Sequence, residues 1–258
     1  MQEVRALCET GAATHVGLVR SRNEDCYLTR PEAGIWAVAD GMGGHEDGDF
    51  ASHTVIEALG SIAAVTSASE LLTLCESRIF DANLRLKEIG RQRGDIIIGT
   101  TVAILLVFDG YYACVWSGDS RIYMVRQDKI TQISRDHTEV QDLLAGGAIT
   151  AEEAGTWSGS NAITRAIGVF DSPELEVCSG PLNASDVFVM CTDGLTRHVD
   201  DEEIMQSVQA NTPQQVCDHL ILLTLERGAV DNVTVIVVQF DSERALPSDV
   251  DAKAPESF

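Results

Sequence analysis

The chain has 258 residues, 45% of them hydrophobic, which is enough to bury a core as one large or two modest domains. Its 40 acidic and 18 basic side chains give a net charge of −22, and such a surface repels nucleic acid and anionic membranes. No apolar stretch approaches the roughly 18–20 residues of a membrane span, so we expect neither a membrane span nor a nucleic-acid partner.

The N-terminus and the cysteines indicate a cytoplasmic protein. The first residues, MQEVRALCETGAA, lack the basic start and apolar core of a signal peptide. The seven cysteines are scattered and form no C-x-x-C pair. We expect reduced thiols, without a disulfide or zinc framework.

Strand-like and helical segments alternate in blocks along the chain. Runs rich in Val, Ile, Tyr and Phe predict strands at 34–40, 100–108, 111–117, 121–126, 186–192 and 233–240. Helices are predicted at 49–65, 69–92, 136–146, 201–210 and 213–227, the last beginning at Thr212-Pro213 as N-cap and N1. Asp109-Gly110 predicts a hairpin between two of the strands. Because strands and helices do not alternate strictly, the fold class is α+β.

One domain is expected over residues 1–241. Residues 140–162 are rich in small residues and are expected to leave the core as an excursion. Residues 242–258 have the polar, proline-containing composition of a disordered tail.

Three carboxylates lie at the ends of predicted buried strands. Asp40-Gly41 follows IWAVA, Asp193-Gly194 follows VFVMCT, and Asp231-Asn232 directly precedes VTVIVV. Carboxylates that converged there would raise one another's pKa unless a cation neutralised them, and Mg²⁺ or Mn²⁺ prefers such oxygen ligands. The alternative for any one of them is an ordinary strand-end turn.

Two further acidic elements extend this set. Glu24 and Asp25 precede a strand-like CYLT, and if extended they face opposite sides, so that one points at a metal and the other orients a water or neighbour. Asp119 lies in the turn that leaves YYACVWS. Arg20 offers a planar fork suited to two phosphate oxygens.

These elements form a longer pattern that resembles a known family. The motifs are THVGLVRSRNED (14–25), VADGMGGH (38–45), GTT (99–101), SGDSR (117–121), RDHT (135–138), NAITRAIG (161–168), CTDGL (191–195) and DNVT (231–234). In order and spacing they resemble the metal-dependent protein phosphatase family (PPM, type 2C) in its compact bacterial form, over about residues 12–240. The resemblance implies a four-layer αββα sandwich of two antiparallel sheets flanked by helices.

The resemblance also implies roles for single residues. Asp40 would bridge two Mn²⁺ or Mg²⁺ ions, Asp193 and Asp231 would complete one, and Glu24 with the Gly41 carbonyl would complete the other. The remaining implied roles are a metal-bound water on Asp25, a third, weaker metal on Asp119 with Asp193, a phosphate clamp on Arg20, and a substrate-selecting flap at 140–162.

The implied reaction is attack of a metal-bridging hydroxide on the phosphorus of phosphoserine or phosphothreonine, with no phospho-enzyme. The general acid is unassigned. Eukaryotic relatives have a histidine directly after the Asp-Gly pair, whereas this chain has Met42. His45 is a candidate, against the alternatives of a surface histidine at a helix start or a metal-bound water.

Three functions are compatible with this pattern. The first is a phosphatase that acts on phosphoproteins, opposes a bacterial Ser/Thr kinase and is a monomer, and the overall acidity favours basic segments around the phosphoresidue. The second is a catalytically dead binding module, which the complete set of acidic residues disfavours. The third is a phosphatase for phosphotyrosine or small phosphomonoesters.

Overall fold

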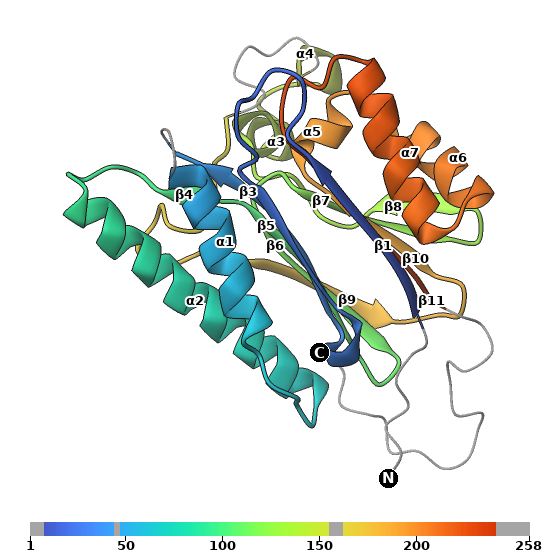
Figure 1. Cartoon of the computed structure of the whole chain (residues 1–258), viewed down its shortest axis with the longest axis horizontal. Coiled ribbons are helices and arrows are strands. Elements are labelled where there is room, and N and C mark those ends of the chain that lie inside the picture. Colours follow the sequence, from blue (N-terminus) through green and yellow to red (C-terminus); the bar gives the residue numbers. More distant parts are fainter. Residues whose placement is uncertain (1–7, 44–46, 155–161, 241–258) are drawn as a thin grey trace.

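Two antiparallel sheets face each other at the centre of the protein, and helices cover their outer faces (Figure 1). The computed structural model describes residues 8–43, 47–154 and 162–240. The first sheet runs in the order β1 (Cys8–His15), β11 (Val233–Phe240), β10 (Val187–Cys191), β7 (Arg121–Arg126) and β8 (Lys129–Gln132). The second runs in the order β2 (Asp25–Arg30), β3 (Ile35–Met42), β5 (Val102–Phe108), β6 (Tyr111–Ser117) and β9 (Glu176–Pro181), with β4 (Gly99–Thr100) paired to β3.

A pair of helices covers each sheet, which confirms the expected αββα sandwich. Helices α1 (Asp47–Gly60) and α2 (Ala68–Gln92) pack on the second sheet, and α6 (Asp201–Ala210) and α7 (Pro213–Glu226) on the first. Four short helices lie between the longer elements: a 3₁₀ helix at Pro31–Ala33, and the α-helices α3 (Glu139–Ala145), α4 (Ala151–Ala154) and α5 (Asp193–Thr196). No helix in the described ranges is long and apolar enough to cross a bilayer.

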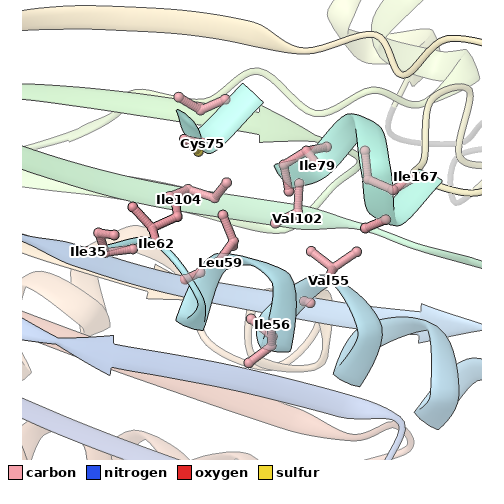
Figure 2. Close-up of a cluster of buried hydrophobic side chains, with 14 of the residues drawn as sticks. Ile35, Val55, Ile56, Leu59, Ile62, Cys75, Ile79, Val102, Ile104 and Ile167 are labelled. Atoms are coloured by element: carbon pink, nitrogen blue, oxygen red, sulfur yellow. The ribbon is translucent and has the colours of Figure 1, made fainter. Parts of the chain in front are cut away.

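Three apolar interfaces separate the four layers. Figure 2 shows the one in which Val55 and Leu59 of α1 and Ile79 of α2 meet Ile104 of β5. Between the sheets, Trp36 of β3 packs with aromatic side chains of β10 and β11. Alternate residues of β11 enter different interfaces, because successive strand side chains point to opposite faces. Strands buried on both faces explain the continuous apolar runs in the sequence.

The predicted elements match the structure with a few corrections. The Asp109-Gly110 hairpin joins β5 to β6, and α7 begins at Pro213, as predicted. The strand predicted at 34–40 continues to Met42, because Gly41 and Met42 pair with β4, so Asp40 lies inside the strand. The segment 100–108 is two strands that separate at Thr101, and the helix predicted at 49–65 ends at Gly60.

Strands β1, β8 and β9 were not predicted. All three occupy sheet edges. Their burial alternates or is partial, and β1 carries the small residues of CETGAATH, which have no strong strand pattern. Tertiary pairing with long, apolar neighbours therefore determines these strands more than local sequence does.

Candidate metal centre

Strand register brings two of the predicted carboxylates together. Asp25 and Asp40 are directly opposite each other in the antiparallel β2–β3 pair. Opposed residues have Cβ atoms about 4.5–5.5 Å apart and side chains on the same face, a position where like charges repel. Thr101 fixes the main chain of Asp40, since its hydroxyl accepts from the Asp40 amide at 3.0 Å and its amide donates to the Asp40 carbonyl at 2.9 Å.

Asp25 joins the two sheets. It is buried, and its Oδ2 accepts hydrogen bonds of 2.8 Å from the hydroxyls of Thr192 and Thr234, which lie just after β10 and within β11. Neither threonine was singled out from the sequence. Because both belong to the opposite sheet, the pair sets the distance between the carboxylates of the two sheets at this end of the sandwich.

Asp193 and Asp231 approach from the ends of β10 and β11. Asp193 is the first residue of α5, and Asp231 lies two residues before β11. The guanidinium of Arg197, one turn along α5, is paired with Asp193 and donates to Oδ2 of Asp231 at 2.8 Å. Arg20 also engages Asp231, with Nε and Nη2 each 2.9 Å from one carboxylate oxygen. Two arginines therefore pair with these carboxylates.

Glu24 and the Gly41 carbonyl converge on the first turn of α1. A Cβ built on Gly48 would lie 2.7 Å from Oε1 of Glu24 and 2.9 Å from the carbonyl oxygen of Gly41. A Cβ on Gly41 would lie only 2.0 Å from the Gly48 carbonyl. The glycines thus permit close packing of β3 on α1.

Burial and mutual repulsion raise the pKa of these carboxyls. Burial, opposed by the two threonine hydroxyls and reinforced by Asp193 and Asp231, raises the pKa of Asp25 to about 7. Burial also raises the pKa of Asp40 well above its usual range, and the charges of Asp25 and Asp193 are the next largest causes. Repulsion of this kind is what a bound cation relieves.

Asp119 joins the same electrostatic group. It lies in the β6–β7 turn and is 7% exposed. Burial, and then the charge of Asp193, raises its pKa to about 7. The raised pKa of Asp193 has burial as its main cause, and Arg197 acts against it.

The residues fit a hard divalent cation by their chemistry. Oδ1 of Asp25, Asp119 and Asp193 are buried oxygens that receive no hydrogen bond within the described structure. At the same time, no three His, Cys, Asp or Glu side chains of the described ranges are arranged closely enough to hold an ion as they stand. The arginine pairs with Asp193 and Asp231 explain this difference, because they direct carboxylate oxygens toward guanidinium groups.

Asn232 organises the loop that carries Arg20 and Glu24. Its side-chain oxygen accepts from the Glu24 amide at 2.8 Å, and its Nδ2 donates to the carbonyls of Val16 and Arg22, also at 2.8 Å. The sequence showed Asn232 only as the neighbour of Asp231. A side chain able to satisfy three main-chain groups holds the loop against the first sheet.

Several of the predicted features are not described by the structure. His45 and residues 155–161 of the flap lie outside the described residues, as does the tail at 242–258. An isolated β-bridge joins Thr138 to Ile163, on either side of the segment predicted to be a flap. His15 accepts a hydrogen bond from the Gly17 amide within its own turn, a structural role.

Comparison with known proteins gives consistent matches. The profile of the family described as protein phosphatase 2C matches residues 4–233. The serine/threonine protein phosphatase PstP of Mycobacterium tuberculosis is 34% identical over 252 residues, which cover 96% of this chain and 48% of PstP. The chain therefore spans about half the length of that curated relative.

Solved structures show the same fold. PppA, a key regulatory component of T6SS in Pseudomonas aeruginosa, has a TM-score of 0.84 and 36% identity over 90% of this chain and 97% of PppA. The catalytic domain of the serine/threonine protein phosphatase PstP in complex with 2 manganese ions has a TM-score of 0.82 and 33% identity, and the match covers 91% of this chain and 99% of that one.

Proposed function

The chain belongs to the protein phosphatase 2C family, and from this membership we propose that it is a metal-dependent phosphatase that hydrolyses phosphoserine and phosphothreonine on proteins. The observation that carries the proposal is the group of buried or partly buried, mutually repelling carboxylates Asp25, Asp40, Asp119 and Asp193. Repulsion among these carboxylates destabilises the folded state, and a bound divalent cation removes this repulsion.

The proposed ligand assignments follow the sequence motifs that the chain shares with the family. Asp40, Asp193 and Asp231 would hold one Mn²⁺ or Mg²⁺ ion, and Asp40 with Glu24 and the Gly41 carbonyl would hold the second. Asp25 orients a water molecule, and Asp119 contributes to a third, weaker site. When bound, such ions lower the pKa of a water molecule and neutralise phosphate charge.

Arg20 binds the phosphate in this proposal. Its side chain is 53% exposed and already adopts a bidentate geometry with the Asp231 carboxylate, at 2.9 Å for each contact. A phosphate presents oxygen pairs of similar spacing, so the same fork suits the substrate. The chain's own contribution to the reaction is thus to bind and orient the phosphoester next to the carboxylates. The general acid stays unassigned.

The biological setting is proposed with the activity. We expect phosphorylated proteins as partners, among them a Ser/Thr kinase or its substrates, and a monomer that acts in the cytoplasm. Residues 1–241 are proposed as one catalytic domain, with a flap at about 140–162.

Phosphate release tests the proposal. Phosphothreonine peptides and p-nitrophenyl phosphate are incubated with Mn²⁺, Mg²⁺ or EDTA, using the wild type, Asp193→Asn and, as a matched control, Asp171→Asn on an exposed loop carboxylate. Activity is expected with Mn²⁺ or Mg²⁺ in the wild type and the control, and a loss of at least about 100-fold is expected in Asp193→Asn or EDTA. Turnover that resists EDTA, or a fully active Asp193→Asn enzyme, contradicts it. A phosphotyrosine peptide tests the alternative specificity.

A further inference from the structure

A hollow beside the candidate metal centre is lined by basic and aromatic side chains. It has a volume of about 370 Å³ and is lined by Arg22, Asp49, Phe50, His53 and Arg93. None of these residues is among the proposed metal ligands. The hollow lies where the start of α1 meets the end of α2, and Figure 1 shows these two helices side by side.

Arg93 is held in a fixed orientation at this hollow. Its guanidinium lies over the Phe50 ring, 5.6 Å from the ring centroid, and one N–H group donates to the largely buried carboxylate of Asp47. A guanidinium has five N–H donors, so this contact leaves others for a ligand. Its side chain is 48% exposed, which gives a ligand access from solvent.

The acidic residue of the hollow is already engaged. Nδ1 of His53 lies 2.8 Å from a carboxylate oxygen of Asp49 and 2.9 Å from its carbonyl, and both atoms accept its proton. Asp49 is therefore oriented by its neighbour on α1. Arg93 supplies the donors with which an incoming anion interacts.

The hollow is connected to the proposed catalytic site by short lengths of chain. Arg22 is two residues from Arg20, so their Cα atoms are at most about 7 Å apart. On the other side, Asp49 follows Gly48, and a Cβ built on Gly48 would lie 2.7 Å from Oε1 of Glu24. A peptide whose phosphate lies at Arg20 therefore reaches the hollow with a residue two or three positions away.

We propose that this hollow is a specificity subsite that binds an acidic side chain, Asp or Glu, two or three residues from the phosphorylated residue of the substrate protein. The inference rests on the proposed phosphatase function. The net charge of −22 favours basic substrate segments in general, whereas this subsite would bind a single acidic residue within such a segment. A fixed guanidinium on an aromatic ring recognises a carboxylate by charge-assisted hydrogen bonds, which act over short range.

Peptide hydrolysis with charge-varied substrates tests the subsite. Phosphothreonine peptides carry Glu, Gln or Lys at the second or third position on either side, and kcat/KM is measured with Mn²⁺. The wild type is expected to prefer Glu over Gln by about five- to tenfold at one of these positions, and the preference should fall as salt rises. The ratio of two substrates in one enzyme preparation does not depend on how much of it is folded.

Matched arginine variants locate the effect. Arg93→Gln is expected to reduce the Glu/Gln ratio to less than about twofold, and Arg22→Gln to reduce it in part. Arg85→Gln is the control, because Arg85 also lies over Phe50, at 5.7 Å, but does not line the hollow. Its ratio should equal that of the wild type.

Two results overturn the subsite while leaving the phosphatase proposal intact: a wild-type Glu/Gln ratio near one at all positions, or an equal reduction in Arg93→Gln and Arg85→Gln. A wild type that hydrolyses p-nitrophenyl phosphate but none of the peptides contradicts the proposed protein substrates and, with them, the subsite.

Discussion

Replacing Arg197 by Gln is expected to strengthen metal binding. Its guanidinium pairs with both Asp193 and Asp231, and its side chain is 32% exposed, so each pair is partly screened by solvent. Pairs of this kind contribute about 0.2–1 kcal/mol each, or about 1 kcal/mol together. A cation that binds the same carboxylate oxygens displaces the arginine, so the free energy of the two arginine pairs is subtracted from the free energy of metal binding. Removing the arginine therefore lowers the Kd for Mn²⁺ by about fivefold.

Titration calorimetry measures the Kd for Mn²⁺ directly, and thermal unfolding in EDTA measures the stability of the protein without metal. Arg197→Gln should bind Mn²⁺ more tightly and unfold at a lower temperature than the wild type when metal is absent. Arg78→Gln is the matched control, because Arg78 is similarly exposed at 39% and pairs with Asp81 on the outer face of α2. A Kd for Mn²⁺ that is unchanged or weaker in Arg197→Gln refutes the reasoning.

Three further predictions concern the same centre. Because burial raises the pKa of Asp25 and Asp119 to about 7, their carboxyls are mostly protonated at pH 6. Calorimetry in buffers of different ionisation enthalpy should therefore show that Mn²⁺ binding releases protons at pH 6 and almost none at pH 8.5. The Asp119→Asn variant should release fewer protons at pH 6. Thr234→Val removes a hydroxyl that donates to Asp25 and should lower the free energy of unfolding by about 1.5–3 kcal/mol in urea melts, whereas an unchanged midpoint would show that this hydrogen bond is dispensable. Asn232→Ala frees the loop of Arg20 and Glu24, and should raise KM for p-nitrophenyl phosphate several-fold; a wild-type KM would remove its positioning role.

The raised pKa values also set the direction of a stability change. A carboxyl whose folded pKa lies near 7, against 3.8 for the ordinary group, keeps its proton in the folded state more strongly than in the unfolded state. These two groups therefore make the metal-free protein less stable as pH rises from about 4 to 7, and they add no further change above that. Bound Mn²⁺ should flatten this dependence in a plot of Tm against pH, whereas equal slopes with Mn²⁺ and EDTA would contradict the cause assigned.

The sequence predicted the parts of the centre that depend on single strands. Asp193 and Asp231 flank β10 and β11 as expected, because long apolar runs mark buried strands well. The order of motifs then indicated the family and with it the sandwich. These features are local, or repeat a pattern shared by the whole family, so one chain is enough to detect them.

Features set by tertiary pairing could not be read in the same way. The register that places Asp25 opposite Asp40 depends on which strands pair, and the hydroxyls on Asp25 come from residues 167 and 209 positions away. Arg197 contacts Asp231, which lies 34 positions further along the chain, and no local sequence pattern indicates such a contact. Gly48 gave no signal, since its role appears only when α1 packs against β3.

Anomalous diffraction from crystals grown with Mn²⁺ tests the central assignment most directly. Two manganese peaks are expected between the sheets, one within about 2.0–2.3 Å of carboxylate oxygens of Asp40, Asp193 and Asp231, the other near Asp40, Glu24 and the Gly41 carbonyl. Absence of manganese at this place in crystals of an enzyme that is active with Mn²⁺, or peaks held by other residues, would contradict the assignment.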